Sequence, residues 1–328
     1  MCADRVVVGD SRPAAESAKL GSVHVEAPEI SDLVVAYDPE TLARLPVRRD
    51  QVLAELEAQR MPRAVRIVSS WPHECGVLDA AHVDRVLLTA HHELTRLSEE
   101  FRQGERMLRI LRPLLQALRN AGVRGPYRIV DVGCGLGFVM RWLAAHGGFG
   151  ADVELMGCDY NAALVNRAQA LADEERLACQ FVAKNAFRLN TEATVFTSTG
   201  VIHHFRGEGL GRFLARQVAV GTAAFVHADI KPSYLAPLGS WIFHEARMRE
   251  PLARHDGVLS ALRAHSGEHL LEAAKHACPE FASSLFDGRR ELLPILRVMQ
   301  ALVGIRRELL PGFVAQLGSL KSHFTEWA

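Results

Sequence analysis

Three glycines and two acidic residues have the types and spacing of a nucleotide-binding site. Gly133, Gly135 and Gly137 alternate directly after a short apolar segment that carries Asp131. A buried strand that runs through glycines into a helix N-terminus lets the chain turn sharply and lets a ligand lie against bare main chain. A second strand-like segment, Val153 to Asp159, ends in a carboxylate 22 residues after the last glycine (159 − 137). That separation is close to the roughly 20 residues expected for an acid that accepts hydrogen bonds from ribose hydroxyls.

The glycine spacing discriminates between nucleotides. The dinucleotide fingerprint is G-x-G-x-x-G, whereas this chain has G-x-G-x-G within VDVGCGLG, residues 130–137. This run resembles motif I of the class I S-adenosylmethionine (SAM) methyltransferases, whose usual form is V-D-x-G-x-G-x-G. An NAD-dependent oxidoreductase remains an alternative, and it predicts that NAD binds and SAM does not.

The resemblance implies SAM as cofactor and assigns positions to the methionine and ribose groups. The methionine carboxylate is assigned to backbone N–H groups at the positive end of the following helix. These groups belong to Gly133, Cys134, Gly135 and Gly137. Asp131 suits the ammonium group, and Asp159 suits both ribose hydroxyls through charge-assisted hydrogen bonds.

The adenine positions follow at the ends of the next strands. Tyr160 and Asn161 come directly after Asp159, and the tyrosine is placed to cover one face of the adenine. A second group follows the third strand, where the family often has Asp-Ala and this chain has Asn-Ala-Phe. Its members are Asn185 for the adenine amino group, Ala186, and Phe187 for packing on the ring. Ser198, near the end of the fourth strand, completes the predicted cofactor-binding residues.

The segment Phe196 to Phe205, FTSTGVIHHF, resembles motif IV of small-molecule methyltransferases of the ubiquinone-biosynthesis-like and related groups, which often end V-L-H-H. DNA amino-methyltransferases instead present Asn/Asp-Pro-Pro-Tyr/Phe here to grip a flipped base. Their motif does not occur in this segment, so we expect no DNA substrate.

Histidines are the candidate catalytic residues. Methyl transfer depends mainly on positioning of the acceptor, and a general base helps when the acceptor is a hydroxyl, a phenol or an acidic carbon. We rank His204 first, then His203, His227 and His255, and a structural role stays open for each. Because neighbours on an extended chain point in opposite directions, we expect only one of His203 and His204 to face the substrate.

We expect no metal site. His265 and His269 stand at i and i+4 on a predicted helix, a spacing that can chelate zinc. They lack the H-E-x-x-H order, however, and exposed helices accumulate such pairs by chance.

Composition indicates an ordinary soluble globular protein. The chain has 328 residues, 48% of them apolar and 23% charged, with a formal net charge of zero, so global charge does not favour nucleic acid or membrane partners. Six cysteines without a C-x-x-C pair are expected to be reduced thiols. The N-terminus lacks the pattern of an export signal, and no uncharged run approaches the roughly 18 residues of a membrane span. We therefore expect a cytoplasmic enzyme.

Alternating strand and helix patterns predict an α/β fold, with a doubly wound, mostly parallel seven-stranded sheet of the Rossmann-like class I type. The predicted strands are 128–132, 153–158, 179–183, 194–199, 223–228 and 281–286. The predicted helices between them are 138–146, 161–176 and 207–219. Two more helices are predicted before the strand at 281–286, over 241–253 and 258–278. Residues 295–305 are either the seventh strand or a helix. Ligands should bind beyond the carboxyl ends of the strands.

The domain prediction has three parts. Residues 1–30 are expected to be poorly ordered, 31–125 to form a helical cap, and 126–328 to form the SAM-binding domain with a substrate lid at about 230–280. A loop is predicted at 71–76. A long helical region, 80–120, is expected to break near Gly104 and to kink or restart at Pro113. It carries an arginine stripe, either a solvated face or a docking surface for an anionic substrate: Arg102, Arg106, Arg109, Arg112 and Arg119.

The predicted function is transfer of a methyl group from SAM to an oxygen or carbon atom of a small aromatic or polyketide-like molecule. Apolar walls are expected from Phe205, Trp241, Phe243 and Met248. Two alternatives remain. One is a methyltransferase acting on RNA or protein, and the other is a non-catalytic SAM-binding protein whose cap fills the acceptor space.

Overall fold

The strand and helix segments from residue 127 onward form one seven-stranded sheet. A computed structural model describes residues 27–218, 221–232, 236–286 and 298–328. The sheet order is β10-β11-β9-β8-β5-β6-β7. Its strands are β5 (Tyr127–Val132), β6 (Val153–Asp159), β7 (Gln180–Ala183), β8 (Val195–Thr199), β9 (Ala224–Ile230), β10 (Phe281–Phe286) and β11 (Met299–Arg306).

All of these strands but one, β11, run in the same direction. β11 is antiparallel to both β9 and β10, so the ambiguous segment 295–305 is a strand from Met299 onward, and its first residues, up to 297, lie outside the described part. This arrangement confirms the predicted mostly parallel class I sheet. The strand order reverses at β5, which lies between β6 and β8. Such a reversal opens a ligand crevice at the carboxyl ends of the strands.

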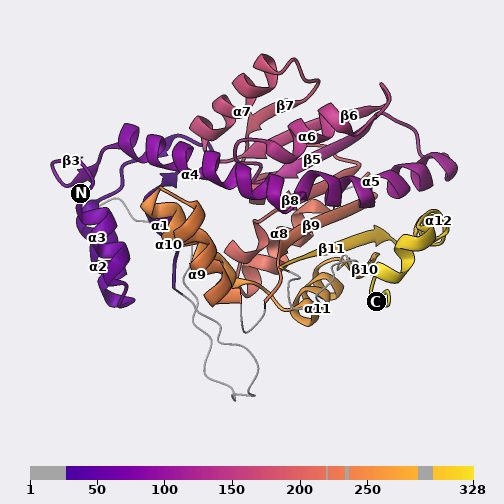
Figure 1. Cartoon of the computed structure of the whole chain (residues 1–328). Coiled ribbons are helices and arrows are strands. Elements are labelled where there is room, and N and C mark those ends of the chain that lie inside the picture. Colours follow the sequence, from indigo (N-terminus) through magenta and orange to yellow (C-terminus); the bar gives the residue numbers. More distant parts are fainter. Residues whose placement is uncertain (1–26, 219–220, 233–235, 287–297) are drawn as a thin grey trace.

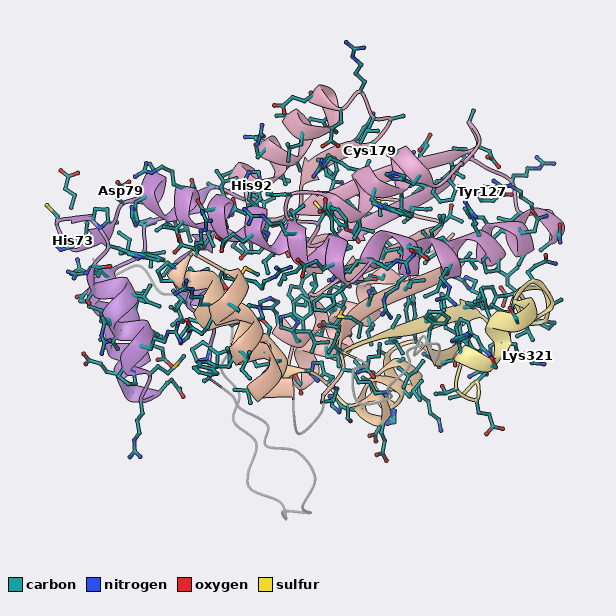
Figure 2. All side chains as sticks on the ribbon, in the orientation of Figure 1. His73, Asp79, His92, Tyr127, Cys179 and Lys321 are labelled. Carbon is teal, nitrogen blue, oxygen red and sulfur yellow. The ribbon has the colours of Figure 1, made fainter. Side chains whose placement is uncertain are left out.

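Strand register brings the predicted motifs together at that edge. Asp131 of β5 is level with Gly157 of β6 and with Thr197 of β8. The next residues along each strand therefore leave the sheet side by side. Figure 2 shows Tyr127, at the amino end of β5, on the side of the molecule away from His92 of the cap helix α4 (Ala80–Glu100) and from Asp79, which caps that helix.

Helices cover both faces of the sheet, each against its own apolar cluster. One face carries α5 (Gln103–Asn120), α6 (Phe138–His146), α7 (Ala162–Glu174) and α12 (Leu310–Gln316). The other face carries α8 (Glu208–Gln217) and α11 (Gly267–Ala277). The core is therefore a three-layer sandwich, with α4 and α5 running end to end across its front in Figure 1.

A third apolar cluster joins the N-terminal helices to the segment that follows β9. Its elements lie beside the carboxyl edge of the sheet (Figure 1). They are α1 (Ile30–Leu33), α2 (Arg49–Ala58), α3 (Pro62–Ser69), α4 (Ala80–Glu100), α9 (Ala236–Arg247) and α10 (Pro251–Arg263). Two short hairpins complete this cap, β1 (Ala36–Tyr37) with β2 (Arg44–Leu45) and β3 (His73–Glu74) with β4 (Val77–Leu78).

The cap differs from its predicted form at the long helical region. The break falls at Phe101–Arg102, where Arg102 has a φ of 53°. Gly104 is instead a packing glycine, because a Cβ built on it would lie 2.3 Å from the Trp142 ring. Pro113 lies inside α5 without ending it, since buried leucines on both sides hold the helix against the sheet.

Four further boundaries depart from the sequence prediction. α5 packs on the sheet, although the predicted cap extended to residue 125. The predicted loop 71–76 contains the start of a hairpin. The helix expected over 241–253 is divided, since α9 ends at Arg247 and α10 begins at Pro251. The helix expected over 258–278 is divided by Ser266, whose hydroxyl caps α11.

The prediction of a poorly ordered N-terminus covers residues 1–30, of which 1–26 lie outside the described part. Within the described ranges, no helix combines the length and apolar character needed to cross a membrane.

Candidate active site at the carboxyl edge of the sheet

The glycine bend between β5 and α6 is bare main chain by necessity. Gly133, Gly135 and Gly137 have φ angles of 71°, 53° and 70°, a region that L-residues with side chains rarely adopt. A Cβ built on Gly133 would lie 2.7 Å from Val201, and one on Gly135 would lie 2.7 Å from the Nδ1 atom of His91. The bend therefore forms a close-fitting cradle whose other wall is α4.

Asp159 links the tip of β6 to this bend. Its Oδ2 atom accepts a hydrogen bond of 3.0 Å from the Gly135 N–H, and its Oδ1 atom accepts one of 2.9 Å from the Asn161 N–H. The side chain is 7% exposed, and burial raises its pKa. Each carboxylate oxygen has a second lone pair, so two ribose hydroxyls can bind without displacing these bonds.

Asp131 lies beneath the bend in a dry environment. It is 3% exposed, and its one hydrogen bond to a side chain is accepted from the Thr197 hydroxyl at 2.8 Å. Burial, with a smaller effect of the Asp159 charge, raises the pKa of Asp131 to about 7. An ammonium group placed beside it would favour the charged form.

The backbone N–H groups of the bend are mostly bonded within the protein. Those of Gly133 and Cys134 both donate to the Cys158 carbonyl, at 2.7 and 3.0 Å. The N–H of Gly137 donates to the Cys134 carbonyl at 2.8 Å. With Gly135 bonded to Asp159, the four N–H groups predicted to bind the methionine carboxylate instead hold the shape of the bend. Burial raises the pKa of the Cys134 thiol well above its usual value, so Cys134 is a protonated packing residue.

The predicted adenine positions are covered by residues 36–40. Tyr160 is 47% exposed and meets the edge of Tyr37, with ring centroids 5.4 Å apart. The Asn185 side-chain amide donates to the Pro39 carbonyl at 3.2 Å. The side-chain oxygen of Asn185 accepts from the Phe187 N–H at 2.9 Å and so caps the short helix η1 (Ala186–Arg188).

Phe187 and Asn161, two further residues predicted to bind the cofactor, have structural partners. Phe187 packs edge-on against Phe205, with ring centroids 5.1 Å apart. Asn161 caps α7, because its side-chain oxygen accepts from the N–H groups of Ala163 and Leu164 at 3.0 and 3.3 Å.

The structure places Ser198 and His227 in the core and not at the site. The two residues are partners in the β8–β9 pairing, and the Ser198 hydroxyl lies 2.9 Å from His227 Nδ1. His227 is fully buried between the rings of Phe225 and Phe213, and burial lowers its pKa to about 3. The cofactor role predicted for Ser198 and the catalytic role predicted for His227 are corrected, because both side chains point into the apolar layer beneath α8.

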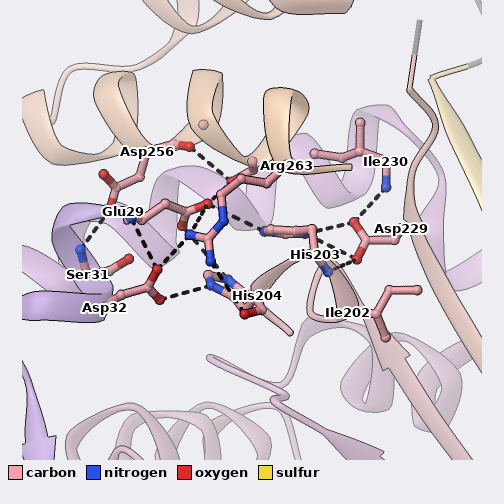
Figure 3. Close-up of polar contacts among 12 residues, drawn as sticks. Glu29, Ser31, Asp32, Ile202, His203, His204, Asp229, Ile230, Asp256 and Arg263 are labelled. Atoms are coloured by element: carbon pink, nitrogen blue, oxygen red, sulfur yellow. Dashed lines mark hydrogen bonds and ion pairs between the residues drawn. The ribbon is translucent and has the colours of Figure 1, made fainter. Parts of the chain in front are cut away.

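The paired histidines lie on a short 3-10 helix, η2 (Ile202–His204), and not on an extended strand. Their ring centroids are 4.3 Å apart, and both rings approach the Glu29 carboxylate, as Figure 3 shows. The expectation that only one of them would face the site is therefore wrong, because the helical turn brings neighbouring side chains to the same side.

Asp229 holds His203 in one orientation. Its carboxylate accepts from the His203 backbone N–H at 3.0 Å and lies 2.9 Å from the Nδ1 atom. The Ile230 N–H donates to the same carboxylate at 2.6 Å. Burial opposes ionisation of Asp229, but the charge and hydrogen bonds of His203 outweigh it and lower the pKa of Asp229. Because an ionised carboxylate can only accept hydrogen bonds, the Nδ1 atom of His203 carries the proton that faces Asp229, and the ring directs Nε2 away from this carboxylate.

His204 is in a different electrostatic state. Its Nδ1 atom lies 3.1 Å from Asp32 Oδ1, and its Nε2 atom lies 3.8 Å from Glu29 Oε2. Burial lowers its pKa, but the Glu29 charge and the Asp32 hydrogen bond outweigh burial and raise the pKa to about 9. His204 is therefore an imidazolium at neutral pH and is not suited to act as a base, contrary to its first rank in the sequence prediction.

Sequence reasoning missed the acidic and basic partners that surround these histidines. Glu29 and Asp32 come from α1, while Arg263 comes from the end of α10 and lies 2.6 Å from Asp32 Oδ2. Asp256 of α10 accepts from the N–H groups of Ile30 and Ser31, each at 3.0 Å. His255 contacts Asp256 at 2.9 Å, so this predicted catalytic residue lies behind the site and supports the α1–α10 contact.

Two other histidines have identifiable places. His91 of α4 lies against the glycine bend, and burial lowers its pKa to about 4. His265 Nε2 lies 2.8 Å from the Phe205 carbonyl and 3.1 Å from the Ile202 carbonyl. It therefore holds the η2 turn in place, with His269 beside it at a ring distance of 5.1 Å.

The chain was compared with known proteins. The methyltransferase domain family matches residues 129–224. A search of curated proteins finds no sequence match. Among solved structures, the chain is similar to magnesium protoporphyrin IX methyltransferase from Synechocystis PCC 6803 with bound SAH, at 14% identity over 79% of this chain and 99% of that one, with a TM-score of 0.42.

Two further solved structures show comparable similarity. A SAM-dependent methyltransferase from Aquifex aeolicus is 13% identical over 61% of this chain and 92% of its own, with a TM-score of 0.39. A TehB-like SAM-dependent methyltransferase from Corynebacterium glutamicum is 16% identical over 65% of this chain and 99% of its own, with a TM-score of 0.38.

The family match covers the residues that form the cradle. It begins in β5 and ends at the first residue of β9, so it includes the glycine bend, Asp159 and η2. The bare main chain at Gly135 and the buried carboxylate of Asp159 fit the ribose of a nucleoside cofactor. Residues 129–224 therefore belong to a class I SAM-dependent methyltransferase domain, and SAM is its cofactor.

Proposed function

We propose that this methyltransferase acts on a small molecule whose acceptor atom, an oxygen or an acidic carbon, loses a proton to His203. The observation that carries the proposal is the His203–Asp229 pair, in which a carboxylate fixes Nδ1 and directs Nε2 toward Glu29 beside α1. The pair lies at the carboxyl ends of β8 and β9, next to the glycine bend along the sheet edge.

The cofactor positions assigned from the sequence remain part of the proposal with two changes. Ser198 is left out, and the glycine bend contributes a bare main-chain surface, because its N–H groups are bonded within the protein. Asp131, Asp159, Tyr160 and Asn185 lie at adjacent strand ends. In support, Asp159 is bonded to the bend itself, and Tyr160 has a half-exposed ring.

The division of labour follows from the chain's own groups. SAM supplies an already activated methyl group, so the protein has to position the acceptor and manage one proton. His203 Nε2 takes the proton from the acceptor, and the Asp229 carboxylate stabilises the resulting imidazolium. The deprotonated acceptor would then be able to take the methyl group, with the electron pair of the broken S–C bond remaining on the cofactor sulfur. General-base assistance of this kind contributes about 10²–10⁴-fold to rate.

The acceptor is proposed to be an aromatic or polyketide-like molecule. Of the predicted wall residues, Phe205 lies beside η2 and packs against Phe187. Met248 belongs to the apolar core of the cap, and Trp241 is 49% exposed, so neither supports this assignment. The side chain of Phe243 lies outside the described part of the structure.

The macromolecular alternative has little support from the arginine stripe. Arg119 pairs with Asp152 at 2.9 Å, and Arg102 pairs with Glu105. Arg112 donates to the Gly147 carbonyl at 3.4 Å. Arginines bonded to their own chain on the sheet-packed helix α5 do not form a free docking surface for RNA or an acidic protein.

One observation favours a second candidate, a SAM-binding protein without turnover. The N-terminal residues Glu29 and Asp32 lie against His203 and His204, where the acceptor would have to approach the proposed base. A cap that fills the acceptor space would leave cofactor binding intact and abolish methyl transfer.

The two candidates are separated by transfer of a labelled methyl group from SAM to a panel of phenols, carboxylic acids and β-dicarbonyl compounds. We expect turnover with at least one class, reduced about 100-fold or more by His203→Asn without loss of SAH affinity. The control is His276→Asn, on the exposed side of α11, which should leave both values unchanged. SAH binding without turnover on any acceptor would favour the non-catalytic candidate.

A further inference from the structure

Glu29, His203 and His204 bring three metal-ligand atoms to one point. One carboxylate oxygen and the two histidine ring nitrogens lie within 4.8 Å of one another. We propose that these three residues bind a divalent transition metal ion of the zinc class, and that the bound ion inhibits methyl transfer. The inhibition rests on the base role proposed above for His203, whereas metal binding does not.

Both histidines are oriented as metal-binding histidines usually are. The Nδ1 atom of His203 lies 2.9 Å from Asp229, and the Nδ1 atom of His204 lies 3.1 Å from Asp32. Histidines that bind metals typically donate their other ring N–H to a carboxylate or a carbonyl, which fixes the ring and raises its basicity. Here the same arrangement directs both Nε2 atoms toward Glu29 (Figure 3).

The Nε2 atom of His203 has no other partner. It is buried and makes no hydrogen bond to any residue that the structure describes, although a buried polar atom without a partner is costly. It lies 3.7 Å from Glu29 Oε1, and the Nε2 atom of His204 lies 3.8 Å from Glu29 Oε2. These separations are too long for hydrogen bonds.

The same separations are close to those of ligands that share one ion. Two ligand atoms, each about 2.0–2.1 Å from a tetrahedral zinc ion, are about 3.4 Å apart. Contraction of the three ligand atoms from within 4.8 Å of one another to about 3.4 Å would therefore create the coordination geometry. A bound ion would also satisfy the unpartnered Nε2 atom of His203.

The charge around the cluster favours a cation. Glu29, Asp32, Asp229 and Asp256 supply four carboxylates. The cations that face them are the Arg263 guanidinium and the His204 imidazolium, and a bound ion would replace the proton on Nε2 of His204. Arg263 Nη1 lies 2.6 Å from Asp32 Oδ2 but 3.5 Å from Glu29 Oε1. The Glu29 carboxylate therefore retains capacity for a second cation.

The ligand set selects the kind of ion. Two imidazoles and one carboxylate suit zinc and its neighbours in the first transition row, whereas calcium and magnesium prefer oxygen ligands alone. Three protein ligands leave one position open in a tetrahedral site. The predicted histidine pair of α11 is not part of this cluster, and Glu29 is too distant in sequence for a spacing motif to reveal it.

The ion and the acceptor proton compete for one lone pair. Coordination to zinc occupies the Nε2 atom of His203, so the residue can no longer take a proton. Zinc at saturating concentration should therefore suppress turnover, and a chelator should restore it.

Zinc binding is measured on the full chain, stripped with EDTA, by competition with a chromophoric chelator. We expect one zinc ion per chain and an affinity at least 10-fold weaker in both Glu29→Gln and His204→Asn. Asp229→Asn, which removes an orienting carboxylate, should weaken binding 10–100-fold. Matched controls are Glu272→Gln and His276→Asn on α11, which should bind zinc as the wild type does.

Cobalt binding provides a readout that needs no variant. Co²⁺ at this site should give visible d–d absorption without the near-ultraviolet sulfur band that a cysteine ligand would produce. Equal zinc affinity in wild type and Glu29→Gln, or a sulfur band with cobalt, would overturn the site.

The methyl-transfer assay separates this inference from the proposed function. Inhibition by zinc that is weaker in His204→Asn supports the inhibitory role, and activation by zinc would overturn it. If the metal-free wild type does not bind SAH or does not turn over any acceptor, the result counts against the proposed function alone. The zinc titration is measured without SAH and without an acceptor, so it tests the metal site independently.

Discussion

The Asp229 carboxylate accepts the backbone N–H of His203 at 3.0 Å and lies 2.9 Å from its Nδ1 atom. These two contacts fix both the turn that carries the histidine and the tautomer of its ring. The buried Asp229 carboxylate therefore links the end of β9 to the turn of η2. The orientation of His203, the base proposed for methyl transfer, depends on this carboxylate.

Asp229→Asn should impair catalysis through the tautomer of His203. An amide can donate to Nδ1, which moves the ring proton to Nε2 and removes the base. We expect kcat for the accepted substrate to fall about 100-fold or more, with SAH affinity changed by less than a factor of three. A lower SAH affinity with unchanged kcat would contradict this role and indicate that Asp229 supports the cofactor side.

Cofactor binding should depend on the ionisation of Asp131. Burial raises the pKa of Asp131 to about 7 in the ligand-free protein, and the ligand ammonium favours the ionised carboxylate. SAH affinity should therefore rise as pH increases from 6 to 8, and binding near pH 7 should release a proton. Calorimetry in buffers of different ionisation enthalpy measures that proton.

Asp131→Asn is the matched control for this prediction. It should bind SAH more weakly and with no proton release near pH 7. Proton release that persists in Asp131→Asn would assign the titration to another group.

Protonation of His204 should stabilise the fold at neutral pH. Glu29 and Asp32 raise its pKa from 6.5 to about 9. Because the folded-state pKa is above the unfolded-state value, this contribution is complete below about pH 6.5 and disappears as pH rises through about 9. The free energy of unfolding should therefore fall between pH 7 and pH 9.5.

The charged groups that face His204 are Glu29, Asp32 and Arg263, with neutral His91 nearby. In His204→Gln the decrease in stability between pH 7 and pH 9.5 should be smaller than in the wild type. Denaturant titrations at a series of pH values measure it. Parallel pH curves for the two proteins would show that other groups carry the dependence.

Gly135→Ala should destabilise the glycine bend. The residue has a φ of 53°, and a Cβ would lie 2.7 Å from His91 Nδ1. Strain of this type costs about 1–3 kcal/mol, and SAH binding should weaken with it. The matched control is Gly211→Ala in α8, where no atom lies within 4 Å of the added Cβ.

Combining Gly135→Ala with His91→Ala separates the two sources of cost. The double variant should regain the stability that is lost to the clash with His91. It should still lack the stability that is lost to the positive φ at residue 135. No recovery would show that the backbone conformation alone determines the cost.

The central strands were predictable because their information is local. β5, β6, β8 and β9 were placed within two residues at each end, and α6 was placed at its observed bounds, Phe138–His146. Short apolar runs between turn residues specify these elements. The face on which a side chain lies was not predictable, because strands buried on both sides show no alternation. Ser198 and His227 were misplaced for this reason.

The acidic half of the site could not be predicted from the sequence. Asp32 lies on a helix of four residues and Glu29 is its N-cap, and a helix of this length is too short to give a periodic pattern. Their position opposite His203 and His204 depends on the packing of α1 against α10. The turn of η2 was also missed, because the segment GVIHH continues the β-rich composition of the strand before it.

The most direct test of the cofactor site is calorimetric titration of SAH into wild type and Asp159→Ala. The geometry of Asp159 and the glycine bend predicts a micromolar-range Kd, about −8 kcal/mol, weakened tenfold or more by the substitution, since a charged hydrogen bond contributes about 1.5–3 kcal/mol. Asp173→Ala, on the exposed surface of α7, should bind as the wild type does. Unchanged affinity in Asp159→Ala, or binding of NAD in place of SAH, would contradict the assignment.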